Sequence, residues 1–410
     1  MVGVDGLEQV AAGPVGETIA VEPAPECVLG VAVADLATVV RRGLRPVAPT
    51  VRPLCEAVGA TLARPIQAHT AEPAVDVAGR DGYVVSGPGP YWVVRAGRVG
   101  AKTAALAVGE AARITAGTPT PLCTSAVIRD AHVEFARVLG QAVLMRASAA
   151  PKTDDTRVRG AQWHAGMVLA PAGVRVGPAV VSVGSSARVG QASVRGPLAA
   201  DVLVTDGRLG RGVRRGASWE PDVVAPVVSD FLRACDFRSG KVWQMNDGEL
   251  LRSWFTLAPQ AQVVVVIGAL EEVRFLLAEL GATLVVDGVR MRPGGEQLLA
   301  RLPDGRTMLA VSADPFEAIA ALMVTGRCVL EALTARDPAA PILGRLVDRA
   351  SATEDLTEVV PVGQVGGGVW RATGPVGVPH LAHLVEAQAL ALLEPGGTRG
   401  ALAELIPLPR

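Results

Sequence analysis

The chain has 410 residues, with 39 Lys and Arg against 40 Asp and Glu, so its formal net charge is −1. This length predicts two to four domains, and the balanced charge argues against nucleic-acid binding, which needs a basic excess. No apolar run approaches the roughly 18 residues of a membrane span, and the N-terminus lacks the basic and apolar regions of a signal peptide. We therefore expect a cytoplasmic protein that does not bind a membrane.

The cysteines and histidines do not form a recognisable catalytic or zinc site. The five cysteines are scattered and never have CxxC spacing, so we expect free, mostly buried thiols. Only His380 and His383 lie close together among the five histidines, and no acidic residue accompanies them. This pattern does not indicate a metal pair or a nucleophilic triad.

The first part of the chain predicts a tail and a domain with an insertion. Residues 1–25 are rich in Gly, Pro and Glu, and we expect a mobile tail there. Residues 26–70 and 145–178 together are predicted to form an N-terminal mixed α/β domain, with a short helix at 30–42. Between them, residues 71–144 show short apolar runs broken by Gly and Pro, which is typical of an inserted β domain.

Residues 179–336 are predicted to form the central α/β domain, because short apolar runs alternate there with amphipathic helical patterns. DVLV at 201–204 and QVVVVI at 262–267 are expected to be parallel strands buried on both faces. In a doubly wound sheet, ligands bind beyond the carboxyl ends of the strands. We expect these ends at three turns: Gly268-Ala269-Leu270, Arg292-Pro293-Gly294-Gly295 and Ser312-Ala313-Asp314-Pro315.

Residues 337–410 return to short strands and predict a small C-terminal β domain. The predicted fold class is therefore multi-domain α/β plus β. In it, a central doubly wound α/β domain lies between an N-terminal part with an inserted β domain and a C-terminal β domain.

Three stretches, taken in their order and spacing, resemble the motifs of one family. GRDGYVV at 79–85, GEAARITAGTPTP at 109–121 and MRPGGEQ at 291–297 are similar to motifs of the molybdopterin molybdenumtransferase family, which includes the C-terminal half of gephyrin. The resemblance covers about residues 25–410. It implies that molybdate is inserted into adenylylated molybdopterin with release of AMP, that Mg²⁺ takes part, and that a homodimer places its sites between subunits.

The resemblance also implies candidate site residues. Asp81 and Asp247 are the implied catalytic carboxylates. The candidate residues for binding molybdopterin are Arg113, Gly117, Arg290, Arg292, Pro293, Gly294 and Asp314. Structural alternatives remain for four of these positions: Asp81 as a turn residue, the two strand-end arginines as solvated side chains, and Asp314 as the cap of the following helix.

The sequence departs from the family motifs where a metal or a phosphate would be held. Gln162 and Arg208 stand where the family has acidic residues, so the ligands of any Mg²⁺ are unknown. Ala116 replaces a threonine, and Gly295 takes the position of a lysine.

The largest departure follows Gly268, where the family has a glycine-rich loop that would offer backbone N–H groups to a phosphate. Here the predicted helix starts at once, and Glu271 and Glu272 place negative charge at its N-terminus. These carboxylates suit the helix dipole but repel an anion.

Two classes of function follow. The first is a molybdenum cofactor biosynthesis enzyme with reduced or lost activity. The second is a non-catalytic, dimeric paralogue that binds a protein partner, as gephyrin-like members of the family do.

Overall fold

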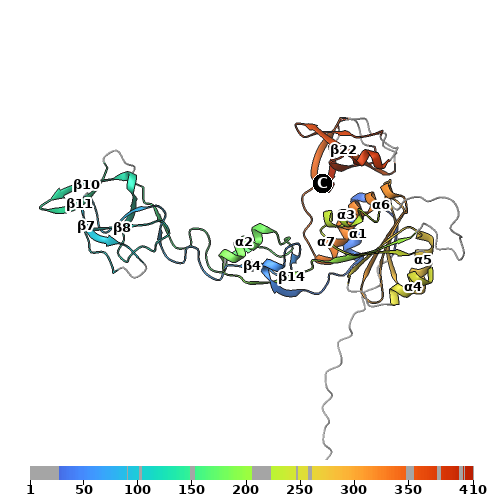
Figure 1. The fold of residues 1–410 in the computed structure, drawn as a ribbon, viewed down its shortest axis with the longest axis horizontal. Helices are drawn as coiled ribbons and strands as arrows, with labels where there is room; N and C mark the ends of the chain where they lie inside the picture. The colour runs from blue at the N-terminus through green and yellow to red at the C-terminus, as the bar shows by residue number, and fades with distance from the viewer. Residues whose placement is uncertain are drawn as a thin grey trace, which may run out of the picture.

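The computed structural model describes residues 27–89, 91–100, 104–147, 153–205, 223–245, 248–256, 261–347, 355–375, 380–396, 400 and 402–409. Figure 1 shows an elongated molecule. A β domain lies at one end, a small domain containing α2, β4 and β14 follows, and the α/β domain with the C-terminal β domain lies at the other end. The predicted N-terminal tail, Arg208 and Asp247 lie outside the described residues.

The centre of the α/β domain is a set of parallel strands in the order β16-β15-β17-β20. Every residue of β17 and β20 is buried, and so is the DVLV segment of β15, which confirms the predicted two-sided burial. Alternate valines of β17 pack into two different hydrophobic clusters, one on each face of the sheet. The bounds of the strands are β15 Ala199–Thr205, β16 Arg238–Met245, β17 Val263–Ile267 and β20 Thr307–Val311.

Helices cover both faces of this sheet. One face carries α1, α3 and a continuous helix made of α6, a π-helical turn and α7, and the other face carries α4 and α5. The continuous helix agrees with the helix predicted from residue 315. The bounds are α1 Val33–Gly43, α3 Val228–Ala234, α4 Gly248–Thr256, α5 Leu270–Glu279, α6 Pro315–Ala321, the π turn Leu322–Gly326 and α7 Arg327–Thr334.

The sheet is mixed, because MRPGGEQ forms the turn of an antiparallel hairpin. Strand β18 (Thr283–Arg292) pairs antiparallel with β19 (Gln297–Arg301), and β19 pairs antiparallel with β20. Two reversals leave β18 parallel to β17 and β20, so its carboxyl end still lies at the edge expected from the sequence.

The N-terminal segment joins the same sheet. Strand β1 (Val28–Ala32) pairs in parallel with β18, and α1 packs against α7. The sequence predicted only a helix at 30–42, because a five-residue apolar run directly before a helix has no periodicity of its own. Residues near both ends of the chain therefore complete the α/β domain.

The sheet also continues into the C-terminal domain. The last two residues of β18 pair with β22 through Met291↔Thr357 and Arg292↔Glu358. The C-terminal strands enclose a separate apolar cluster. Their bounds are β21 Ile342–Leu346, β22 Thr357–Gly366, β23 Val369–Ala372, β24 Ala389–Leu393 and β25 Leu402–Pro407, with a 3-10 turn at Leu381–Leu384.

The inserted β domain is a six-stranded sheet in the order β10-β11-β7-β8-β6-β9. Small apolar clusters cover its two faces. Its strands are β6 Gly82–Val85, β7 Tyr91–Arg98, β8 Glu110–Ile114, β9 Ala126–Arg129, β10 Val133–Val138 and β11 Gln141–Arg146, with a 3-10 turn at Asp130–His132.

A small domain connects the inserted β domain to the α/β domain. Helix α2 and strand β14 belong to it, because Val194 packs in one cluster with Leu54 and Leu62. Its elements are β2 Thr50–Pro53, a 3-10 turn at Leu54–Glu56, β3 Thr61–Leu62, β4 Ile66–Gln67, β13 Val168–Ala170, α2 Pro178–Ser186 and β14 Gln191–Arg195. The pair β5 Val77–Ala78 and β12 Thr156–Arg157 leads from it into the inserted domain.

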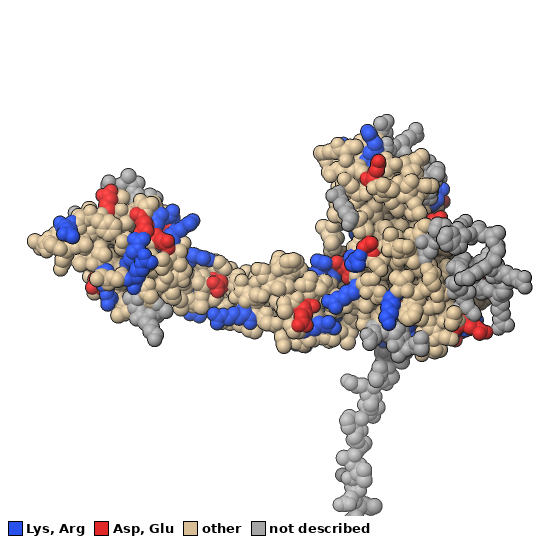
Figure 2. Space-filling view, in the orientation of Figure 1, with Lys and Arg blue, Asp and Glu red and all other residues tan. Residues whose placement is uncertain are grey.

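No helix in the described part of the chain is long and apolar enough to cross a membrane. Basic and acidic side chains are interspersed over the face shown in Figure 2, as expected for a chain with almost no net charge.

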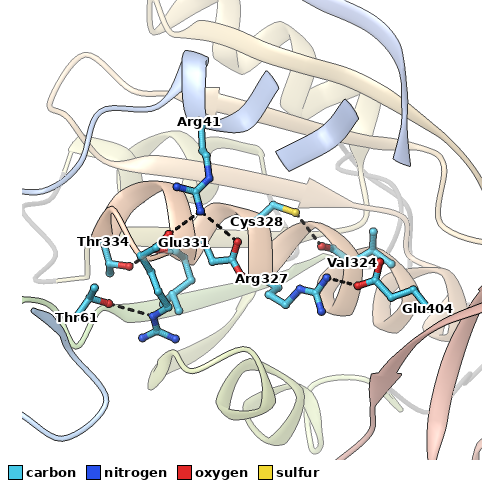
Figure 3. Close-up of polar contacts among 10 residues, drawn as sticks. Arg41, Thr61, Val324, Arg327, Cys328, Glu331, Thr334 and Glu404 are labelled. Carbon is cyan, nitrogen blue, oxygen red and sulfur yellow. Dashed lines mark hydrogen bonds and ion pairs between the residues drawn. The ribbon is translucent and has the colours of Figure 1, made fainter. Parts of the chain in front are cut away.

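A buried arginine joins the small domain to the α/β domain. Arg336, which follows α7, donates hydrogen bonds to Asp236 (2.6 Å), to the Thr61 hydroxyl (3.0 Å) and to the Gly59 carbonyl (3.1 Å). Arg41 of α1 in turn donates to the Arg336 carbonyl at 2.5 Å. Figure 3 shows Arg41 and Thr61 approaching α7 from different elements. The guanidinium therefore fixes two domains at one point.

We expect Arg336→Leu to lower the free energy of unfolding by about 3 kcal/mol, because it removes three hydrogen bonds from a buried charged group and deprives Asp236 of one partner. Arg233→Leu is the matched control, since Arg233 pairs with Asp230 on an exposed surface and should change stability by less than about 0.5 kcal/mol. Urea unfolding of both variants measures the difference. Equal shifts in the two variants would contradict the role of Arg336.

Candidate functional site

The first two motifs meet at one edge of the inserted β domain. Antiparallel pairing of β6 with β8 places Gly82 opposite Ile114, and the Asp81 carboxylate accepts a hydrogen bond from the Ala116 N–H at 2.8 Å. Gly117 has a φ of +78°, which favours glycine, and its N–H donates to the Ala78 carbonyl at 2.7 Å. Asp81 therefore fastens the loop in which Gly117 lies, as a turn residue does.

Arg113 is held by its own domain. Its guanidinium donates to the Tyr83 hydroxyl (3.1 Å) and to both carboxylate oxygens of Asp130 (2.9 and 3.2 Å). The hydrogen bond to Tyr83, and then those to Asp130, raise the pKa of Arg113. The positive charge is therefore already compensated, and a ligand anion would have to compete with Asp130.

At the α/β domain, strand β17 passes into α5 through only two residues, as the sequence predicted. Gly268 and Ala269 both have positive φ values, of 88° and 51°, and α5 begins at Leu270. A Cβ atom on Gly268 would lie 2.5 Å from the Thr205 hydroxyl, so this turn is packed closely against the end of β15. The Gly268 N–H donates to the Val311 carbonyl at 2.9 Å, so it is already occupied and does not face a phosphate.

The Pro293-Gly294 turn is also packed into the domain. A Cβ atom on Gly294 would lie 2.8 Å from the Glu317 carbonyl of α6, and the Gly294 carbonyl accepts a hydrogen bond from Gln297 at 3.0 Å. Both turn residues are buried. The close approach of the hairpin to α6 explains why glycine is needed there.

The two strand-end arginines differ in their surroundings. Arg292 forms an ion pair with the buried Glu358 at 2.9 Å. No hydrogen bond or ion pair engages the exposed Arg290 guanidinium within the described part of the chain. Arg290 lines a cleft of about 730 Å³ between α1, α7 and the C-terminal domain.

Asp314 acts as a helix cap. Its carboxylate accepts a hydrogen bond from the Glu317 N–H at 2.9 Å, at the N-terminus of α6. The Ser312 hydroxyl accepts a hydrogen bond from the Asp314 N–H at 3.2 Å. The contacts therefore show Asp314 as the helix cap that the sequence offered as the alternative to ligand binding.

The candidate residues form two separate groups in one chain. Asp81, Arg113 and Gly117 lie in the inserted β domain, whereas Arg290, Arg292, Pro293, Gly294 and Asp314 lie in the α/β domain at the other end of the molecule (Figure 1). The described residues contain no group of three or more His, Cys, Asp or Glu side chains that could hold a metal ion. Among the described residues of one chain there is thus no preformed carboxylate cluster for Mg²⁺.

The residues that sequence reasoning missed are the partners of the arginines. Asp130 lies 17 positions from Arg113, and Glu358 lies 66 positions from Arg292. Glu358 is the second residue of an apolar strand, and a charged residue at that place was the available signal. Of the thiols, only Cys235 and Cys328 are buried, so the expectation of mostly buried cysteines was wrong for Cys27, Cys55 and Cys123.

This architecture is similar to that of known proteins. The model of the MoeA N-terminal region, domains I and II, matches residues 31–190, and the fold of the whole chain matches structures of MoeA proteins. Residues 31–190 therefore resemble the MoeA N-terminal region, and the chain shares the MoeA fold. No match was found among curated proteins.

The structural matches extend over nearly the full length of the chain. Two structures of the molybdopterin biosynthesis MoeA protein of Pyrococcus horikoshii are 20% and 16% identical, with TM-scores of 0.68 and 0.72. They cover 93% and 92% of this chain, which spans 99% of each. A molybdenum cofactor biosynthesis protein of Pyrococcus furiosus is 13% identical with a TM-score of 0.55, covering 92% of this chain and 98% of its own. At such identities these structures show the shared MoeA fold.

We expect Asp81→Ala to speed amide hydrogen exchange at Ala116 and to lower stability by about 1 kcal/mol, because the loop loses its side-chain acceptor. Asp81→Asn keeps an oxygen acceptor and should leave both quantities close to the wild type. Hydrogen exchange and thermal unfolding measure the two effects. If Asp81→Asn behaved like Asp81→Ala, the carboxylate charge would matter more than the hydrogen bond.

Proposed function

We propose that this chain is a molybdenum cofactor biosynthesis protein that binds a molybdopterin-type ligand but transfers molybdate far more slowly than an intact member of its family. The match of residues 31–190 to the MoeA N-terminal region, and the MoeA fold over 93% of the chain, support the ligand class. The main observation that supports reduced activity is the two-residue turn between β17 and α5. It leaves no glycine-rich turn and places Glu271 and Glu272 at the helix N-terminus.

The remaining cations are few. At the strand ends Arg290 is the uncompensated cation, whereas Arg292 and Arg113 already pair with carboxylates. Transfer of phosphoryl and adenylyl groups depends mainly on positioning and on compensation of negative charge. In this chain Arg290 would attract the phosphate of the ligand. No described residue is placed to activate a nucleophile.

The activity assay follows AMP release from adenylylated molybdopterin with molybdate and Mg²⁺. We expect turnover at least about a hundredfold below that of an intact homologue, since loss of a single preorganised donor commonly has that effect. An intact MoeA protein in the same buffer is the control, and circular dichroism confirms that both are folded. Turnover within about tenfold of the homologue would contradict the proposal.

We further propose that the chain works as a homodimer. The two groups of candidate residues lie at opposite ends of one chain, so they can share a ligand only if a second copy supplies one of the groups. Light scattering at micromolar concentration should give twice the chain mass of 42.2 kDa. A mass of one chain would argue against a shared site.

The second candidate function is that of a non-catalytic scaffold that binds a protein partner. The cleft between α1 and the C-terminal domain favours it, because Leu343 and Leu402 are well exposed there beside Arg290. These residues suit an extended segment of a partner that carries apolar side chains. Absence of AMP release from a folded dimer would leave this function as the better account.

A further inference from the structure

The Arg292–Glu358 pair lies at the junction of two domains. Arg292 ends β18 and Glu358 is the second residue of β22, and the parallel register places the two residues directly opposite each other. The Arg292 Nη2 atom lies 2.9 Å from Glu358 Oε1. The backbone pairing thus holds the two side chains next to each other.

The two partners differ in their access to solvent. The Arg292 side chain is 45% exposed, whereas that of Glu358 is only 2% exposed. The second carboxylate oxygen of Glu358, Oε2, is fully buried and accepts no hydrogen bond. A buried carboxylate with one oxygen unsatisfied depends strongly on its only cation. Glu358 therefore holds Arg292 more firmly than an exposed carboxylate would.

The surroundings of this pair are acidic. The same edge of the sheet carries the exposed or partly exposed carboxylates Glu271, Glu272, Glu296, Asp314 and Glu317, against the two guanidinium groups of Arg290 and Arg292. With Arg292 compensated by Glu358, Arg290 is the one cation among the described residues named here that opposes these negative charges. The described residues at this edge therefore repel a phosphate.

We propose that Glu358 determines the ligand preference of the strand-end edge, because its ion pair with Arg292 suppresses binding of phosphate groups there. The inference rests on the proposed function for the location of the ligand site. It assigns the weak anion binding to one residue of the C-terminal domain rather than to the missing loop alone. Without the charge of Glu358, Arg292 would offer its full positive charge to a phosphate.

The test compares binding of inorganic phosphate and of AMP by calorimetry in the wild type and in Glu358→Gln. The amide keeps the shape and an oxygen acceptor for Arg292, but it removes the negative charge. We expect phosphate and AMP to bind about tenfold more tightly in the variant. Glu279→Gln is the matched control, since Glu279 also pairs with an arginine at 2.9 Å but lies at the other end of α5, and it should leave both affinities unchanged.

Arg292→Gln supplies a second measurement that does not depend on the folding of Glu358→Gln. In the wild-type background Arg292 is compensated, so Arg292→Gln should weaken phosphate binding by less than about twofold. In the Glu358→Gln background, Arg292→Gln should abolish the roughly tenfold increase in phosphate affinity. Unchanged phosphate affinity in folded Glu358→Gln, or a loss above about tenfold in Arg292→Gln alone, would overturn the proposal. Phosphate binding is measured without AMP release, so failure of the transferase proposal and failure of this inference are separate results.

Discussion

A charged group inside a protein must find partners for all its hydrogen-bond donors, and Arg336 imposes this requirement on two domains at once. Its guanidinium is satisfied only when Gly59 and Thr61 of the small domain lie beside Asp236 of the α/β domain. The position of the small domain then fixes the point from which the inserted β domain extends. Arg175, which also pairs with Asp236, and the hydrogen bond from the Asp337 N–H to the Gly173 carbonyl join the same two domains.

The structure separates the family fold from the chemistry of the family site. The sheet, its helices and the C-terminal domain have the fold of MoeA proteins, and the strand-end edge carries carboxylates beside a two-residue turn after β17. These features are local, because Glu271, Glu272 and Glu358 occupy the ends of elements whose cores are apolar. A scaffold of this kind can retain its stability while its ligand preference changes.

Local patterns in the sequence predicted the features that local physics determines. The apolar runs predicted the buried strands β15 and β17, and the Asp-Pro pair at 314–315 offered a helix cap as the alternative to a ligand role. Contacts between distant residues were beyond such patterns. Nothing near Arg292 indicates Glu358, and nothing near Val28 indicates β18, because these pairings depend on how the sheet is assembled.

The pairing of β1 with β18 sets an order for folding during synthesis. Roughly 250 residues separate the two strands, and at about 5–20 residues per second the ribosome needs roughly 13–50 s to make them. The small domain and the inserted β domain emerge complete in that interval, whereas the apolar side of α1, with Leu36 and Val40, has no α7 to pack against. Helix α1 is therefore synthesised before the other described helices but is among the last of them to be buried.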